Sequence, residues 1–395
     1  SNGLEKRPKL RFPGFDEPYK QCHIGDIYAE RSQRGASDMV LLSVTMNDGV
    51  IPRSEIEGKD NSSEDKSNYK VVLTGDMVYN SMRMWQGANG ISPCDGIVSP
   101  AYTVLMPKIP ISNGYFAALF KSPNLINEFR KNSQGMTSDT WNLKYPQIET
   151  IKVCIPALSE QNRVADMLRT LERRIAKQAQ LVDNLKKYKR GVVRTLLSPD
   201  SCCIEETTWT TAKIGDLGSF TKGAPLSKAD ITPDGTPFIL YGELYTTYHE
   251  VINSVIRRTK AQPEKQYYSH VGDVIIPTSG ETPEEISTAA CVMLPDIILA
   301  GDLNIFRSSK IDGRIMSYIL NHIVNGQIAR IAQGKSVVHI QASELSKIEI
   351  SYPDYNTQRK MFKIFDALNT RTEIAQKKLM ALRCMQKALL QQLFM

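Results

Sequence analysis

The sequence lacks the features that define several protein classes. Its 395 residues contain no apolar run near the ~20 residues that a membrane-spanning helix needs. The N-terminal residues have no signal-peptide pattern. The seven cysteines form no Cys-x-x-Cys motif, so neither a disulfide framework nor a zinc site is predicted. We therefore expect free thiols in a reducing compartment, and a cytoplasmic protein.

The sequence also lacks recognisable catalytic motifs. It has no Asn-Pro-Pro-Tyr-like methyltransferase motif, no Gly-x-Ser-x-Gly and no His-Glu-x-x-His. Gly334-Lys335-Ser336 resembles a phosphate-binding loop, but position 329, where that loop needs glycine, is Ala329. The five histidines are scattered along the chain. We predict no catalytic residue, no metal and no cofactor, which favours a recognition protein over an enzyme.

The positive charge is concentrated in two short segments. The net charge is +7, yet residues 159–197 alone carry +6 and residues 356–395 carry another +6. Residues 1–158 carry +1, and residues 198–355 carry −6. Basic segments of this kind can contact phosphates, present a solvated helix face or bind an acidic protein. Charge alone leaves these alternatives open.

The chain contains an internal repeat, in which a residue of the first half matches the residue 197 positions later in the second half. Under this offset Gly75-Asp76 matches Gly272-Asp273, Pro156 matches Pro353, and Gln161 matches Gln358. Earlier in the chain, Ile24-Gly25-Asp26 matches Ile214-Gly215-Asp216 at an offset of 190. A shared offset over more than about 100 residues indicates a duplicated unit rather than chance turn motifs.

Each repeat begins with a segment of short strands and turns. Val71-Val72-Leu73 leads into a Thr-Gly-Asp turn, and Val274-Ile275-Ile276-Pro277 follows the matching turn in the second repeat. Apolar residues at helical spacing predict one helix over Gly114–Lys131 and another over Ile315–Gln333. The repeat is therefore predicted to be a mixed α/β (α+β) lobe.

Each repeat ends in a long helix with a heptad seam, and Ser159 is the expected N-cap of the first. Two such helices can bury their seams against each other. We expect them to pair antiparallel as a coiled coil in a pseudo-twofold molecule. The predicted seam residues are Leu168, Leu171, Ile175, Val182, Leu185, Val192 and Leu196, then Phe365, Leu368, Leu379, Leu382, Leu389 and Leu393.

These patterns divide the chain into four predicted parts. Lobes are expected over 15–158 and 205–355, and spacer helices over 159–198 and 356–395. A helix of this length spans roughly 58 Å at 1.5 Å per residue. B-DNA repeats about every 34–36 Å. Lobes held apart by such helices could therefore reach two half-sites about one turn apart or somewhat more.

Several segments resemble type I restriction–modification DNA specificity subunits. Arg83-Met84-Trp85-Gln86 and the following Gly96-Ile97-Val98-Ser99-Pro100 are similar to a stretch of that family's target recognition domains. Ile151 to Pro156 followed by Glu160-Gln161, repeated as Ile348 to Pro353 followed by Gln358-Arg359, resembles the family's entry into its helices. The second lobe departs from the pattern, because Pro277-Thr278-Ser279-Gly280 replaces the Arg-Met-Trp-Gln stretch.

The resemblance implies that each lobe is a target recognition domain that reads one half of a bipartite double-stranded DNA target. It also implies that the helices dock two methyltransferase subunits and that restriction (endonuclease) subunits join them. The chain itself would then be non-catalytic. The competing hypotheses are a duplicated coiled-coil scaffold whose lobes bind protein or glycan, and an unrecognised enzyme with a site between the lobes.

Candidate DNA contacts follow from the preference of Arg for guanine and of Asn and Gln for adenine. In the first lobe the candidates are Arg83, Trp85, Gln86, Gln134, Ser138, Trp141, Asn142 and Lys144. In the second lobe they are Thr278, Ser279, Lys335, His339 and Gln341, chosen because they match the first-lobe loops by position. Trp85 and Trp141 could instead be core residues, and Lys335 could contact a phosphate.

Overall fold

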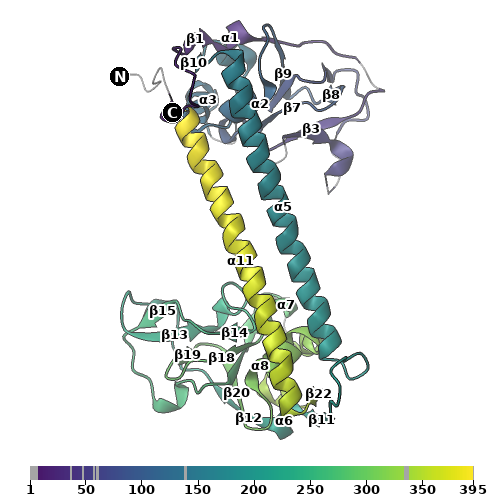
Figure 1. Ribbon diagram of the computed structural model, residues 1–395, viewed down its shortest axis with the longest axis vertical. Helices are drawn as coiled ribbons and strands as arrows, with labels where there is room; N and C mark the ends of the chain where they lie inside the picture. Colours follow the sequence, from purple (N-terminus) through teal and green to yellow (C-terminus); the bar gives the residue numbers. More distant parts are fainter. Residues whose placement is uncertain are drawn as a thin grey trace. The chain divides into compact units, whose positions relative to one another are not determined.

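The chain forms two compact units in the computed structural model (Figure 1). One comprises residues 1–180 and 376–395, and the other residues 181–375. The structure describes residues 8–35, 38–46, 49–56, 58, 62–137, 140–332 and 338–394. No helix of this described part is long and apolar enough to cross a membrane. Each unit holds one lobe together with one end of each long helix.

The first lobe is built on small antiparallel sheets. Its largest sheet has the strand order β2 (Tyr28–Glu30), β9 (Tyr102–Pro107), β6 (Met77–Asn80) and β7 (Asn89–Ile91). Three strand pairs surround it: β1 (Lys20–His23) with β10 (Lys152–Ile155), β3 (Leu42–Thr45) with β4 (Gly49–Pro52), and β5 (Lys70–Val72) with β8 (Gly96–Val98). Short helices α1 (Ile24–Ile27), α2 (Asn113–Leu119), α3 (Pro123–Asn132), α4 (Tyr145–Ile148), η1 (Arg53–Glu55) and η2 (Met84–Gln86) connect the strands.

The second lobe has a larger, mixed sheet. Its strand order is β12 (Gly218–Lys222), β20 (Leu303–Ser308), β16 (Asp273–Pro277), β18 (Ala290–Val292) and β14 (Val251–Ile252), the last pair being parallel. The lobe also has a three-stranded sheet, with the strand order β15 (Arg257–Thr259), β13 (Thr236–Leu240) and β19 (Ile298–Ala300). Two strand pairs complete it: β17 (Ser279–Gly280) with β21 (Val338–His339), and β11 (Trp209–Lys213) with β22 (Glu349–Pro353). The helices are α6 (Ile214–Leu217), α7 (Pro283–Ile286), α8 (Gly313–His322), α9 (Asn325–Ile331), α10 (Ala342–Leu345), η3 (Lys228–Asp230), η4 (Tyr241–Glu243) and η5 (Lys265–Tyr267).

The duplicated Gly-Asp pair has the same structural role in both lobes. Asp76 accepts a hydrogen bond from the backbone of Leu73, and its carboxylate receives both the Nε and an Nη of Arg31 at 2.6 and 3.1 Å. Asp273 accepts from the backbone of His270 and receives Arg307 in the same bidentate way, at 2.8 and 2.9 Å. Bidentate pairing of this kind fixes direction as well as distance. The repeat in the sequence therefore reflects a repeated ion pair between the aspartate of a turn and an arginine, which directly follows β2 in the first lobe and lies in β20 in the second.

Two helices replace the single helix predicted in the middle of each lobe. In the first lobe α2 ends and α3 begins at Pro123, whose ring cannot continue the hydrogen-bond ladder, and Ser122 caps the new helix by accepting from Leu125 at 3.4 Å. In the second lobe α8 gives way to α9 at Val324. The prediction of one continuous helix was wrong because helical periodicity survives across such a short break.

The long helices are α5 (Leu158–Leu196) and α11 (Tyr355–Phe394). In the first unit, the start of α5 and the end of α11 share one core, which includes Val164, Leu168 and Leu393. In the second unit, the end of α5 and the start of α11 share another, with Leu196 and Phe365. The α5 and α11 segments of each unit therefore pack together. Ser159 is not the N-cap, because the backbone of Glu160 and Gln161 already donates to the carbonyl of Ala157.

Burial along the long helices follows the heptad spacing. Of the predicted seam residues, Leu168, Leu171, Val182, Leu185, Leu196, Phe365 and Leu393 are buried, and Ile175, Val192, Leu368, Leu379, Leu382 and Leu389 are half-buried. The same spacing also places Gln178 and Lys189 on α5 and Thr372 and Gln386 on α11. These four polar seam positions were not predicted, because only apolar residues were sought.

A glutamine side chain fastens each lobe to its long helix. Gln161 Nε2 donates to the carbonyl of Pro156 at 2.9 Å, and its Oε1 accepts from the backbone of Ser112, just before α2, at 3.1 Å. Gln358 makes the equivalent bonds to Pro353 at 2.8 Å and to Asp312, just before α8, at 2.9 Å. Both glutamines are at most 3% exposed. We call this arrangement the glutamine clamp.

Candidate nucleic-acid interface

Two segments of the first lobe carry its predicted DNA contacts, residues 81–88 and residues 133–144. We call them the first-lobe loop pair. The 81–88 segment follows β6 and turns through η2, in which Met84 is fully buried. Gly87 ends η2 with a φ of +84°, a conformation that favours glycine. Because Met84 points into the core, its neighbours Arg83 and Trp85 lie at the surface, exposed and half-buried respectively.

The 133–144 segment packs against residues 81–88. Gln134 and Asn142 exchange backbone hydrogen bonds of 3.0 and 2.8 Å and so close the segment into a narrow loop. The backbone of Leu143 donates to the carbonyl of Ser81 at 2.9 Å. The rings of Trp85 and Trp141 meet edge to face with centroids 5.2 Å apart. The structure therefore brings together residues that lie about sixty positions apart in the sequence.

Most of the predicted first-lobe contacts are accessible. Gln134 and Lys144 are exposed, and Gln86, Trp141 and Asn142 are half-buried. Trp85 is also tied to its own loop, since its Nε1 donates to the carbonyl of Met82 at 3.1 Å. Ser138 lies outside the described residues. The accessible edge of this loop pair therefore carries one guanidinium, one amine and the amides of Gln86 and Gln134, whereas Asn142 Oδ1 is buried.

The second lobe has an equivalent loop pair, residues 278–288 and 338–341. The backbone of Ile340 donates to the carbonyl of Thr278 at 3.0 Å. These two residues match Leu143 and Ser81 at the offset of 197, so the same hydrogen bond ties both loop pairs. Ser279 pairs with His339 between β17 and β21. Lys335 lies outside the described residues.

The predicted second-lobe contacts differ in accessibility. His339 and Gln341 are exposed, whereas Thr278 is half-buried. Ser279 is buried, and its hydroxyl donates to Asp302 Oδ2 at 2.7 Å. The exposed side chains of Glu281 and Glu284 and the half-buried Glu285 lie in the same segment. This surface therefore combines hydrogen-bonding groups with negative charge, in keeping with the net acidity of residues 198–355.

Lys222 adds a cation to the second-lobe loop pair, and no sequence pattern pointed to this residue. It ends β12, about fifty residues before the loops, and its Nζ donates to Asn304 Oδ1 at 2.9 Å. Asn304 in turn donates to the carbonyl of Ile340 at 3.4 Å. Burial lowers the pKa of the Lys222 amine, an effect that Asp302 opposes. Only the pairing of β12 with β20 brings this lysine to the loops.

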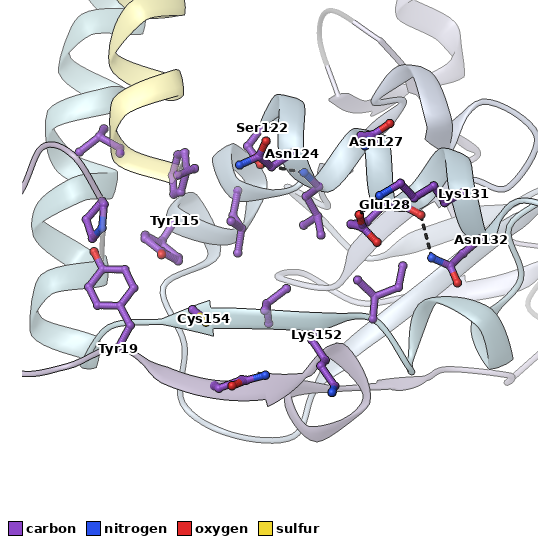
Figure 2. A pocket seen from close by; sticks show the side chains of 18 of the residues that line it. Tyr19, Tyr115, Ser122, Asn124, Asn127, Glu128, Lys131, Asn132, Lys152 and Cys154 are labelled. Carbon is purple, nitrogen blue, oxygen red and sulfur yellow. Dashed lines mark hydrogen bonds and ion pairs between the residues drawn. The ribbon is translucent and has the colours of Figure 1, made fainter. Parts of the chain in front are cut away.

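A hollow of about 730 Å³ lies elsewhere in the first unit, between α3, β10 and the end of α11 (Figure 2). Its lining includes Tyr19, Tyr115 and Lys152, together with polar side chains of α3 such as Asn127 and Lys131. None of the predicted DNA contacts lines it. Among the described residues no group of His, Cys, Asp and Glu side chains could hold a metal ion. The loop pairs thus remain the candidate interface.

The fold matches solved structures along nearly its full length. It is similar to the type I restriction-modification S subunit from M. genitalium, with a TM-score of 0.60 and 14% identity over 98% of this chain and 99% of that chain. A structure reported for complex assembly and conformational transition of the type I R-M system gives 0.61 and 14% over 98% and 99%. The HsdS subunit from Thermoanaerobacter tengcongensis gives 0.50 and 15% over 97% of each chain.

A family model also matches both repeats. The type I restriction modification DNA specificity domain is found over residues 36–187 and again over residues 206–383. Together the two matches cover most of the chain, and each includes most or all of one lobe and a large part of one long helix. The chain therefore belongs to the type I restriction–modification DNA specificity family, as a specificity subunit with two copies of the domain.

Proposed function

We propose that the chain recognises a bipartite double-stranded DNA target, with one lobe reading each half. The observation that carries this proposal is the duplicated loop pair, tied in both lobes by the same backbone hydrogen bond, from Leu143 to Ser81 and from Ile340 to Thr278. The backbone arrangement of the loop pair is repeated, but the side chains that the two loop pairs carry differ. Two loop pairs of the same backbone arrangement with different side chains suit two different half-sites.

In this proposal the first-lobe loop pair reads bases directly. Arg83 is exposed and can donate two hydrogen bonds to a guanine, while Gln86 and Gln134 suit adenine. Asn142 stays a candidate contact, although its Oδ1 is buried. Lys144 contacts a phosphate, which positions the lobe without specifying sequence. Trp85 and Trp141 support the loops and offer ring edges to the DNA.

The second-lobe loop pair uses other chemistry. His339, Gln341 and Thr278 supply donors and acceptors, and Lys222 supplies the cation that offsets the nearby glutamates. Glutamate can accept a hydrogen bond from the amino group of cytosine. Ser279 acts by holding Asp302 rather than by touching a base, since its hydroxyl is buried and already used. Lys335 stays a candidate contact.

We infer that the long helices dock two methyltransferase subunits and that restriction subunits join this assembly. The support is the positive charge of the helices, of which Lys186, Lys187 and Arg190 on α5 are exposed examples. We also infer a non-catalytic role, because the family is described by its specificity and the chemistry would belong to the partners. The predicted domain boundaries and the cytoplasmic location stay predictions.

Methylation mapping tests the proposal. The chain is expressed with the methyltransferase encoded beside it, and modified positions are mapped across the host genome. The expected result is a split motif of two short half-sites with a fixed spacer, modified on both strands. Modification of a contiguous motif, or none in the presence of a folded complex, contradicts the proposal.

Salt dependence separates DNA recognition from a protein-binding or glycan-binding scaffold. Binding to duplex DNA is measured with the methyltransferase present at increasing salt, because phosphate contacts release counterions and weaken steeply. Specific binding that weakens with salt supports the proposal, and no specific binding at any salt favours the scaffold.

A further inference from the structure

A lysine occupies a seam position of α5 at the end that packs with the second lobe. Lys189 follows Val182 and Leu185 at the heptad spacing, and Val192 and Leu196 continue the series. A lysine in an apolar seam is costly unless its charge is paired. Lys189 Nζ lies 2.9 and 2.8 Å from the two carboxylate oxygens of Glu250, and the two side chains are only 15% and 10% exposed.

Glu250 is held from the lobe as well as from the helix. His322, the last residue of α8, places Nε2 2.7 Å from Glu250 Oε1. The backbone carbonyl of Glu250 accepts from Ser317 Oγ at 2.7 Å and from the backbone of Cys291 at 2.9 Å. The carboxylate therefore sits at a fixed point where α5, α8 and the edge of the sheet meet.

Tyr318 joins α11 to the same cluster. Its ring stacks on His322 with centroids 5.9 Å apart, and Lys189 Nζ lies 5.6 Å from its centroid. Its hydroxyl accepts from Asn369 Nδ2 of α11 at 2.6 Å. Both long helices and the lobe thus contact one set of polar side chains, all of which lie in the second unit.

This buried ionic cluster is better suited to fixing the orientation of its members than to adding net stability. Burial alone would raise the pKa of Glu250, but the hydrogen bond from His322 and the charge of Lys189 outweigh it and lower that pKa to about 2. A buried ion pair is often no more stabilising than apolar residues of the same volume, yet removing one partner is strongly destabilising. Such a cluster tolerates only one arrangement of its members, which suits a part that fixes orientation.

The ion pair of Lys189 is specific to one of the two repeats. The position on α11 that matches Lys189 at the offset of 197 is Gln386, which carries no charge. In the first unit an ion pair to a long helix lies instead at the start of α5, where Arg11 contacts both carboxylate oxygens of Glu160 at 2.9 and 2.8 Å. The two lobes are therefore fixed to their helices by different ionic contacts added to a shared glutamine clamp.

We propose that Lys189, Glu250 and His322 form a positioning joint that sets the angle of the second lobe on α5 and thereby the spacer length that the subunit accepts. The inference rests on the proposed bipartite recognition. None of the three residues need touch DNA, so they are positioning residues. Binding to a single half-site does not depend on the angle of the second lobe on α5. Binding to two half-sites at a fixed spacing does, because the second lobe contacts its half-site only when the lobe angle fits that spacing.

The test compares spacer preference with half-site binding. Duplexes carry the mapped target with its native spacer, the spacer shortened or lengthened by one base pair, or the second half-site alone, and are bound by the subunit with its methyltransferase. The first variant is Lys189→Met. The second is Lys189→Met with Glu250→Met, which removes the ion pair but keeps the site filled. Lys213→Met on β11, an exposed lysine of the same lobe, is the control.

We expect both joint variants to lose about fivefold or more of the preference for the native spacer while binding the half-site within about twofold of wild type. The control keeps the wild-type preference. A folded double variant, judged by its thermal unfolding, that keeps the full spacer preference would overturn the inference. Wild-type protein that shows no preference among spacers would instead overturn the proposed bipartite function, so the two failures are distinguishable.

Discussion

Trp85 and Trp141 come from separate segments of the first lobe and meet edge to face, their centroids 5.2 Å apart and their planes at 75°. The contact joins the two halves of the first-lobe loop pair at the surface. The sequence left both tryptophans open between a core role and a DNA role. Both are half-buried rather than enclosed. In the proposed function they therefore have an intermediate role and set the shape of the surface that would contact DNA.

Trp141→Ala is expected to weaken recognition of the first half-site only. An aromatic pair contributes roughly 0.5–1.5 kcal/mol beyond its buried area, so loss of one ring should loosen the loops without unfolding the lobe. Competition binding with duplexes altered in one half-site at a time measures the effect. Equal weakening toward both half-sites would contradict the assignment, and Trp141→Phe should restore most of the affinity.

Arg83→Ala and Lys144→Ala are expected to weaken DNA binding in different ways. Loss of a bidentate contact from Arg83 to guanine should reduce cognate binding by about 1–3 kcal/mol and relax specificity at one base pair. Loss of a phosphate contact from Lys144 should weaken all sequences alike and reduce the salt slope by about 1. Lys20→Ala on β1 serves as the control. If Arg83→Ala leaves the ratio of cognate to non-specific binding unchanged, its role as a base contact is wrong.

Gln161→Leu and Gln358→Leu should destabilise their units to a similar extent. Each change leaves a buried proline carbonyl and a buried backbone N–H without a partner, at a cost of about 1–3 kcal/mol for each group. Denaturant unfolding of each variant measures the loss. An apolar leucine of similar size controls for volume, so a loss below 1 kcal/mol in either variant would argue against the clamp in that repeat.

Glu250 should make the second unit sensitive to acid. Its pKa falls from 4.5 to about 2 on folding, so the stability that it contributes is complete above pH 4.5 and is lost as the pH falls toward 2. Lys189 and His322 are the charged or titratable groups that contact it. Glu250→Gln should be less stable than wild type at pH 7, by about 3–5 kcal/mol, with the gap closing in acid.

Unfolding in guanidinium chloride at several pH values measures this gap. Other carboxylates titrate in the same range, but they are common to both proteins and cancel in the difference. A gap that stays constant between pH 7 and pH 3 would show that the Glu250 carboxylate is not stabilised in its charged form.

Periodic features of the fold could be predicted from the sequence, whereas features that depend on tertiary contacts could not. The duplication, the mixed α/β lobes and the two seam helices follow from patterns that repeat many times along the chain. The break at Pro123 was missed because the apolar periodicity continues across it. Lys189 adds to the positive charge of residues 159–197, but its pairing with Glu250 could not be predicted, because the two residues lie sixty-one positions apart and only folding brings them together.

The candidate site was predicted unevenly for a similar reason. Arg83, Gln86 and Trp85 lie in one continuous motif, and the second-lobe candidates could be chosen by their match to the first-lobe loops. Lys222 has no such signal, because it reaches the second-lobe loops through strand pairing. Nor could the sequence indicate that the hydroxyl of Ser279 is already used by Asp302.

The glutamine clamp has a consequence for how such a molecule can change over time. It anchors each lobe through backbone groups at the end of β10 or β22 and ahead of α2 or α8, at sites that do not include the loop pairs. Substitutions in residues 81–88 or 278–288 can therefore accumulate without disturbing the attachment of the lobe. The residues that attach the lobe are therefore separate from the proposed DNA-contacting loops, and in the proposed function a new DNA preference can arise by mutation in the loops while the lobe stays attached to its helix.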